Sequence, residues 1–285
     1  MTEATTNNQA EAAPQEGGEI IHESTIFAEP VAHIGSFTIT NSLIMSWVTV
    51  LVLVVGFILV GRRLRQTPKG LQNVFEILLE EALNLADMVT GSRKKTERFL
   101  PITLALFLFI LVNNWLGLLP GVGTIGMVET HGTERIFVPF LRGGTADLNL
   151  TLAIALFAVV MSHIMGVVMV GAWGHFNKFI NINAFKDMLK KVRKEPMVLI
   201  VNPIKIFVSL IELVGEFAKV ASLSLRLFGN IFAGEVLLAT MMSLMAFFLP
   251  LPFMFLEMIV GVVQALVFAV LTLAFMSIAA THEEH

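Results

Sequence analysis

The 285-residue sequence contains no cysteine, few charged residues and a first segment without basic residues. The absence of cysteine excludes a disulfide framework, thiolate metal sites and a cysteine nucleophile. Residues 1–40 hold six glutamates and no lysine or arginine. A signal peptide begins with a positively charged region, so we expect no signal peptide here. The first half of this segment has the composition of a disordered tail.

Charge is scarce in the whole chain, since 14% of the residues are charged and 55% are hydrophobic. The apolar residues fall in runs longer than about 18, the length that predicts bilayer-spanning helices. The sequence therefore indicates a polytopic membrane protein. The net charge is only −3, and nucleic acid is not an expected partner. Because the sequence shows no nucleophile triad, phosphate-binding loop or metal cluster, we expect neither soluble catalysis nor a cofactor.

Three apolar stretches, at 43–60, 99–119 and 148–171, each have the length of one span. In residues 71–89 the apolar positions follow helical spacing and polar residues occupy the other face, which predicts an amphipathic helix at the membrane interface. Basic residues mark the cytoplasmic side, and they stand at 62, 63, 65 and 69, at 93, 94, 95 and 98, and at 178, 186, 190, 191, 193 and 194. This distribution places the N-terminus outside and the C-terminus inside.

The segment 197–249 carries no loop signal. As one helix its 53 residues would extend roughly 80 Å, against a hydrocarbon core of about 30 Å. Either an unmarked turn divides it into two spans, or one long helix lies strongly tilted; the lack of turn residues favours the tilted helix. Pro250 and Pro252 then predict a tight outer turn before a returning helix at 253–280.

The predicted fold is an all-α polytopic membrane protein. It comprises three upright spans, an interfacial amphipathic helix and a long, strongly tilted two-helix hairpin. In this interpretation residues 1–40 form an external N-terminal tail and residues 41–285 form a single membrane domain.

Arg226 is the most informative residue, because it lies inside the long apolar segment, in the string SLSLRLFGNIFAGE at 222–235. A guanidinium stays charged, at a cost of roughly 2.5–3.5 kcal/mol at bilayer depth on insertion scales. One interpretation is a structural ion pair with a nearby glutamate. The other is an ion or proton pathway, which ionisable groups at this depth usually line.

Polar residues follow a narrow face of this long helix at spacings of four, three, seven and four: Glu212, Glu216, Lys219, Arg226 and Asn230. Gly234 continues the line. On the returning helix, Glu257, Gly261 and Gln264 share one face. Glu235 is nine residues from Arg226 and so lies on the opposite side of its helix. Two polar paths on different faces are therefore available.

Five segments of the sequence are similar to a known family. They are the arginine string, NNWLGLLPG at 113–121, TADLNLT at 145–151, the Glu212 region and the C-terminal LVFAVLTLAFMSIAATHEEH. Together they resemble the a subunit of F-type ATP synthases, the membrane stator that carries protons past a rotating ring of c subunits. The resemblance covers about residues 40–285. It is poor over the first forty residues and over 122–144, so it assigns those segments no role.

The resemblance implies a non-catalytic subunit in the inner membrane of a bacterium. Its implied partners are the c-subunit ring, the b subunits of the peripheral stalk and membrane lipid, and its transported ion is the proton. Ion choice in such machines is set on the ring. The basic loop 186–194 would bind anionic headgroups or the stalk.

Carried over by position, the resemblance makes Arg226 the essential stator charge and Asn230 its neighbour facing the ring. Glu212 would belong to the half-channel that opens to the cytoplasm. The other half-channel, or the seam beside the arginine, would include Glu235, Glu257 and Gln264, with Asp147 and Asn149 near the outer mouth. Position 257 is often histidine in bacterial relatives, and the glutamate here titrates lower than an imidazole.

Two other functions fit a membrane protein of this kind. A self-contained channel or secondary transporter would need a complete ion pathway within the chain, and no internal repeat of the transporter type is evident. A structural or insertase-like protein has no use for polar lines on two helix faces. Single residues also stay open: His163 is either a proton relay or hydrogen-bonded to a neighbouring helix, and Lys219 would pair with Glu216 or Glu212.

Overall fold

The computed structural model describes residues 20–21, 25–62, 70–131, 134–179, 198–245 and 248–281. Helices dominate it, and they are α1 (Asn41–Gly61), α2 (Leu71–Thr90), α3 (Arg93–Gly117), α4 (Leu148–Val170), α5 (Ala172–Phe179), α7 (Val198–Leu244) and α8 (Pro250–Ala279). The basic residues at 63–69 and 186–194, on which the predicted topology partly depends, lie outside the described residues.

Five helices are long and apolar enough to cross a membrane: α1, α3, α4, the Phe207–Leu244 part of α7, and α8. They coincide with the predicted apolar segments, which confirms a polytopic membrane protein. The predicted amphipathic segment forms α2, which is not among the five. The 47 residues of α7 form one continuous helix. Tilt is defined against a membrane plane, so the division into upright spans and a tilted hairpin stays a prediction.

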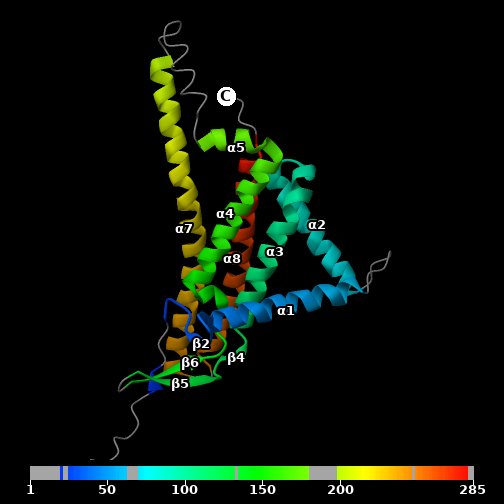
Figure 1. The fold of residues 1–285 in the computed structure, drawn as a ribbon. Helices are drawn as coiled ribbons and strands as arrows, with labels where there is room; N and C mark the ends of the chain where they lie inside the picture. The colour runs from blue at the N-terminus through cyan, green and yellow to red at the C-terminus, as the bar shows by residue number, and fades with distance from the viewer. Residues whose placement is uncertain are drawn as a thin grey trace, which may run out of the picture.

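Figure 1 shows α3, α4, α7 and α8 running alongside one another, while α1 crosses them at a large angle. The largest core cluster lies where these four helices meet, and it contains Leu106, Ile110, Ile154, Ala155, Ala158, Val159, Leu223, Leu227, Ala265 and Phe268. Small residues on α4 and α8 allow their neighbours to approach closely, which is how helices associate in lipid. The four helices therefore form the rigid body on which the polar residues are carried.

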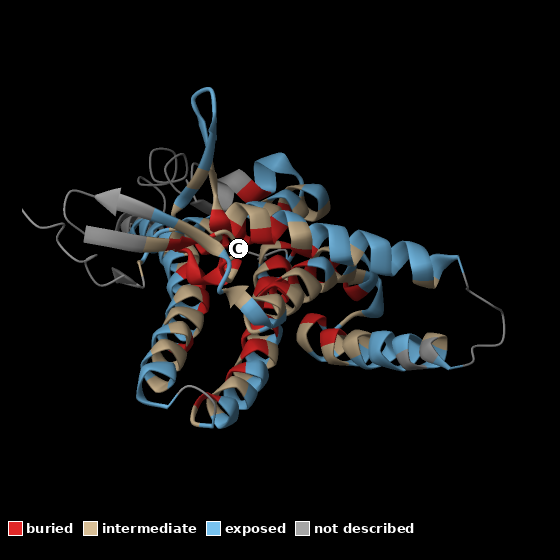
Figure 2. Cartoon of the chain, turned by 90° about the horizontal axis from the view of Figure 1, so that it is seen from below, coloured by how far each residue is buried: buried red, intermediate tan, exposed pale blue. Residues whose placement is uncertain are grey.

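Buried residues gather in this body, and the outlying helices stay exposed (Figure 2). Only 17% of the most apolar window of α1 and 11% of that of α7 is buried, against 39% for α8. Exposed apolar residues line both α1 and α7, for example Leu51, Phe57, Leu213 and Phe217. Faces of this kind suit lipid or another membrane protein, because neither presents water to the apolar side chains.

Short strands cover one end of the helical body (Figure 1). They are β1 (Ile20–Ile21), β2 (Pro30–Ile34), β3 (Phe37–Thr40), β4 (Pro120–Gly123), β5 (Gly126–His131) and β6 (Glu134–Pro139). β5 and β6 pair antiparallel and β1 adds parallel to β6, whereas β2 and β3 form a separate hairpin. The sequence predicted a tail and a loop in these places, so the all-α description holds for the membrane helices only.

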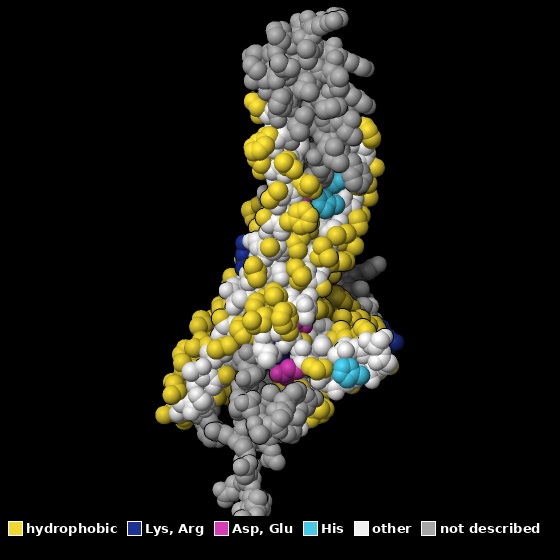
Figure 3. Space-filling view, turned by 60° about the vertical axis from the view of Figure 1, so that its left-hand side comes forward, with side chains coloured by type: hydrophobic (Ala, Val, Ile, Leu, Met, Phe, Trp, Pro, Cys, Tyr) yellow, Lys and Arg dark blue, Asp and Glu magenta, His cyan; other side chains and the backbone are white. Residues whose placement is uncertain are grey.

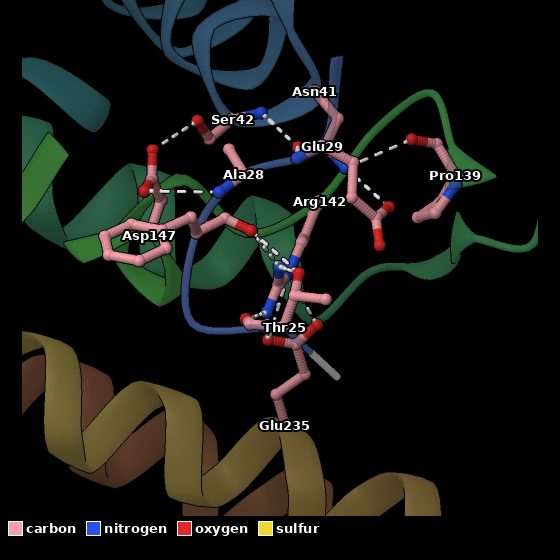
Figure 4. A network of polar contacts seen from close by, with 10 residues as sticks. Thr25, Ala28, Glu29, Asn41, Ser42, Pro139, Arg142, Asp147 and Glu235 are labelled. Carbon is pink, nitrogen blue, oxygen red and sulfur yellow. Dashed lines mark hydrogen bonds and ion pairs between the residues drawn. The ribbon is translucent and has the colours of Figure 1, made fainter. Parts of the chain in front are cut away.

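Asp147 joins three segments at the end where the strands lie (Figure 4). As the N-cap of α4 it accepts a hydrogen bond from the Asn149 backbone N–H at 3.0 Å. Its carboxylate also accepts from the Ser42 hydroxyl at the start of α1 at 2.8 Å and from the Ala28 N–H at 3.3 Å. The side chain is buried. This one carboxylate therefore fixes the N-terminal segment and α1 to the start of α4.

We expect Asp147→Ala to lower the free energy of unfolding by about 2 kcal/mol, the upper range for loss of an N-cap. The physical reason is that the Ser42 and Ala28 donors also lose their acceptor. Thermal unfolding of the purified protein in detergent, followed by tryptophan fluorescence, measures the change. Asn149→Ala is the matched control, because it keeps the backbone donor and removes an exposed side chain. Equal midpoints for the two variants would contradict the role given to Asp147.

Candidate functional site

Arg226 lies on an exposed face of α7, halfway along the membrane-length part of the helix. Its Nη2 donates to the Ser222 hydroxyl one turn earlier, at 3.3 Å. Among the described residues, no carboxylate lies within ion-pair distance of its guanidinium. The structural ion pair that the sequence left open is therefore not formed with any of them. Its exposed neighbours on α7 carry no charge, and they include Ser222, Asn230 and Leu225, the last at 58% exposure. Figure 3 shows one face of the molecule, on which hydrophobic side chains far outnumber charged ones.

Toward the strand-bearing end, α7 and α8 approach each other at two places that involve polar side chains of α8. Asn230 Nδ2 donates to Gln264 Oε1 at 2.7 Å, and Gln264 is buried. One turn further along α7, Gly234 lies directly against the Glu257 carboxyl group, so that a Cβ at position 234 would overlap it. Glycine is required there because only its missing side chain leaves room for the carboxyl group. The predicted residues Asn230, Gln264 and Glu257 therefore lie along one seam between the two helices.

Glu235 faces away from this seam and binds Arg142, in the loop that follows β6 (Figure 4). Arg142 Nε lies 2.9 Å from Glu235 Oε1, and Nη2 lies 2.9 Å from Oε2, which makes a bidentate pair. The guanidinium also donates to the Thr25 carbonyl at 2.7 Å and to the Thr25 hydroxyl at 3.1 Å. Arg142 is 5% exposed and Glu235 31%.

Sequence reasoning did not identify Arg142 as a functional residue. The available signal was its isolation, since the segment 122–144 holds only two arginines. A buried arginine needs an acidic partner, but spacing along the chain could not show that this partner lies 93 residues away.

At the opposite end of α7, charged and imidazole groups line a pocket between α4, α5, α7 and α8. Glu212, Glu216 and Lys219 face it from α7. Lys219 Nζ lies 2.7 Å from Glu216 Oε1, which confirms the first of the two pairings considered for that lysine. His163 of α4 contacts both Glu216 and His175 of α5, so its hydrogen bonding to neighbouring helices is established. His175 was missed, because nothing in the sequence brings it to this pocket.

The structure thus divides the predicted residues into separate groups. Arg226 lies on the exposed face of α7 without a carboxylate partner among the described residues. The Asn230–Gln264 and Glu257 contacts lie after it along α7, and Glu212 lies before it. Glu235 belongs to the arginine pair in the outer loop. The predicted outer-mouth residues also separate: Asp147 is buried in the junction described above, and the side chain of Asn149 is exposed.

Comparison with known proteins shows which family this chain resembles. A protein-family profile described as ATP synthase A chain matches residues 43–277. The chain belongs to this family. It is 32% identical to ATP synthase subunit a of Syntrophobacter fumaroxidans, with 89% of this chain and 90% of the relative covered.

Two further relatives agree with this assignment. Subunit a of Moorella thermoacetica is 28% identical, with 87% of this chain and 94% of the relative covered. A protein of Syntrophotalea carbinolica named ATP synthase subunit a 1 is 32% identical, with coverages of 84% and 85%.

The Arg142–Glu235 pair generates a prediction about stability. We expect Arg142→Met to lower the free energy of unfolding by about 2 kcal/mol, less than the roughly 3–5 kcal/mol for a fully buried pair because Glu235 is partly exposed. The released carboxylate loses its partner, and Thr25 loses the donor that holds its backbone. Thermal unfolding in detergent gives the first readout, and faster protease cleavage near residues 25–29 gives the second.

The double variant Arg142→Met/Glu235→Met is the matched control, since it removes both charges together. It should recover part of the stability lost in the single variant. A single variant as stable as the unmodified protein would show that the pair contributes nothing.

Proposed function

We propose that this protein is the proton-conducting stator subunit of an F-type ATP synthase, and that Arg226 is its essential charge. The observation that carries the proposal is the exposed guanidinium in the middle of the membrane-length part of α7, with no carboxylate of the described residues beside it. A charge kept at bilayer depth without an internal partner needs an external one. The similarity to proteins named ATP synthase subunit a supports a c-subunit ring as that partner.

The proposed mechanism follows from elementary electrostatics. A ring carboxyl group that approaches a fixed guanidinium releases its proton more readily, because the positive charge favours the carboxylate. The permanently positive Arg226 also repels protons, so the two half-channels do not connect directly. Each proton must then travel with the rotating ring from one half-channel to the other. The membrane potential supplies about 2.3 kcal/mol per charge per 100 mV to drive this rotation.

The two half-channels are assigned to the two polar regions on either side of Arg226. In this proposal Glu212 belongs to the inner half-channel. The outer half-channel and the adjoining seam include Glu257, Gln264 and Asn230. Glu235, Asp147 and Asn149 lie on the outer side, where Glu235 and Asp147 also have the binding partners described above.

The subunit would reside in a bacterial inner membrane, with residues 1–40 as its external segment and 41–285 as its membrane domain. The strands at one end of the helical body would face outside, and α5 and the end of α8 would face the cytoplasm. The apolar faces of α1 and α7 would contact lipid, the ring and the b subunits of the peripheral stalk. The subunit itself carries out no catalysis and binds no cofactor in this scheme.

A self-contained channel or transporter is less well supported by the position of Arg226. Residues that define an internal ion pathway face the interior of a helix bundle or a water-filled cavity. Arg226 faces outward from the packed helices, on an exposed face that it shares with the uncharged residues Ser222, Leu225 and Asn230. A surface of this kind suits a second membrane protein that supplies the other half of the path.

We expect Arg226→Ala to abolish both ATP-driven proton pumping and proton-driven ATP synthesis while the complex still assembles. Assembly survives because the surrounding surface is apolar, and loss of the charge also removes its desolvation cost. Fluorescence quenching of a pH-sensitive dye in inverted vesicles measures pumping. Arg226→Lys should also be severely impaired, since an ammonium can lose its proton when buried and lacks the planar fork of arginine.

Ser222→Ala is the matched control for this experiment, because it removes the hydrogen bond between the guanidinium and the Ser222 hydroxyl and leaves the charge in place. It should retain most of the coupled flux. Coupling at the unmodified level in the alanine variant of Arg226 would refute the stator mechanism.

The proposed topology is tested by single engineered cysteines, since the native chain contains none. A cysteine at position 130, in β5, should react with a membrane-impermeant reagent added from outside. A cysteine at position 281, just after α8, should react only from the cytoplasmic side. The opposite pattern in an assembled complex would invert the assignment of the two half-channels.

A further inference from the structure

The β2–β3 hairpin has no part in the proposed mechanism, and its two faces differ in chemistry. The strands pair antiparallel, with Ile34 opposite Phe37 and His33 opposite Thr38. Successive side chains of a strand point to opposite faces, so the histidine pair lies on the reverse of the isoleucine pair. The Thr38 hydroxyl lies 3.1 Å from His33 Nδ1, a hydrogen bond across the polar face. The other face, called here the apolar hairpin face, is formed by Ala32, Ile34, Phe37 and Ile39.

The turn of the hairpin fixes this division into two faces. Gly35 and Ser36 are the two residues between the paired strands, and Gly35 has a φ of +63°. Two-residue hairpin turns with glycine in the first position match the twist of the strands that they join. A turn of this length sets the register, so Ile34 and Phe37 lie directly opposite each other beside the tip.

The apolar hairpin face is not covered by the part of the chain that the structure describes. Ile34 is 69% exposed and Phe37 58% exposed, and Figure 2 shows how exposed the outlying segments are. An antiparallel sheet commonly packs its apolar face on another layer and leaves its polar face to water. A two-stranded hairpin alone is marginally stable. This hairpin therefore needs a covering layer from outside the described chain.

The base of the hairpin is fixed at the start of a membrane-length helix. Thr40, the last residue of β3, is the N-cap of α1 and accepts a hydrogen bond from the Leu43 N–H. The Asn41 N–H donates to the Glu29 carbonyl at 3.1 Å. Trp47 of α1 is 54% exposed and lies about 10 Å along the helix axis from Thr40. Since tryptophan concentrates at membrane interfaces, the hairpin begins where α1 leaves the hydrocarbon layer.

The direction and composition of the hairpin favour lipid as the covering layer. In Figure 2 the hairpin projects from the helical body at a large angle to α1. With α1 as an upright span, as the sequence predicts, the hairpin runs along the membrane surface. Residues 30–40 include no lysine, arginine, aspartate or glutamate, so no charged side chain of the hairpin has to leave water. The exposed apolar residues of α1, among them Val50 and Leu51, continue the same lipid-facing surface.

We propose that the β2–β3 hairpin lies in the headgroup region of the outer leaflet, with its apolar hairpin face against membrane lipid. Ile34 and Phe37 point toward the acyl chains, and His33 and Thr38 point toward water. Amphipathic segments bind the membrane interface in this manner. The hairpin thereby anchors the outer end of α1 at the bilayer surface. This inference depends on the membrane topology of α1 and not on the role of Arg226.

Single cysteines carrying a small fluorophore test the contact, since the native chain contains none. They are placed at 34 and 37 on the apolar face and at 33 and 38 on the polar face. The protein is purified with its native partners into lipid nanodiscs, where the medium reaches both membrane faces. Iodide quenches labels in water, and a nitroxide attached near the lipid headgroup quenches labels in the interface.

We expect the nitroxide lipid to quench labels at 34 and 37 about threefold more than labels at 33 and 38, with the reverse order for iodide. The two polar-face positions are matched controls, because they lie on the same hairpin beside the same turn. Equal iodide quenching at all four positions would place the apolar face in water and refute the proposal. Protection of 34 and 37 from both quenchers would show a protein cover, which also refutes lipid contact.

A second reporter leaves both tip residues in place. A labelled cysteine at position 32, on the apolar hairpin face, should be quenched by the nitroxide lipid in the otherwise unmodified protein. Phe37→Ser should reduce this quenching about threefold, because the side chain inserted deepest is lost. Thr38→Ala, on the polar face, should leave it unchanged. Undiminished quenching in Phe37→Ser would contradict the anchoring role.

Discussion

The cost of holding charge inside a hydrocarbon layer governs this structure. Several polar side chains on the membrane helices have partners within the described chain: Asn230 bonds to Gln264 across two helices, Lys219 pairs with Glu216 along α7, and Glu235 pairs with the arginine of the outer loop. Arg226 has no carboxylate beside it among the described residues, and its guanidinium donates to a hydroxyl on its own helix. A permanent charge without an ion-pair partner on an exposed helix face suits contact with a second protein there.

Glycines allow these polar contacts to form at close range. Gly234 admits the Glu257 carboxyl group between α7 and α8, and Gly166 admits the His175 ring between α4 and α5. In lipid the hydrophobic effect contributes little to helix association, because the lipid tails are as apolar as the side chains. Close packing and hydrogen bonds therefore hold the helices together. The same glycines that let the helix backbones approach closely therefore also set the positions of the titratable groups at both ends of α7.

The sequence was sufficient to predict the helices but not how the segments outside them pack. Short strands form at 20–21, 30–34, 37–40, 120–123, 126–131 and 134–139, although the composition of these segments indicated a tail and a loop. Their pairing joins segments more than a hundred residues apart, as when β1 adds to β6. Long-range pairing of this kind has no local signature, in contrast to the apolar runs that define spans. The angle at which α1 crosses the other helices has no local signature either.

Sequence alone determined the membrane class, the places of the apolar helices and the spacing of the polar residues along α7, because length, hydropathy and helical spacing are local properties of the chain. The tertiary structure decided which polar groups have partners. It paired Arg142 with Glu235, used Asp147 as a helix cap and brought His175 to His163, none of which spacing could indicate. It also left Arg226 exposed. Partnering depends on contacts between helices distant in sequence, and those contacts exist only once the four-helix body has packed.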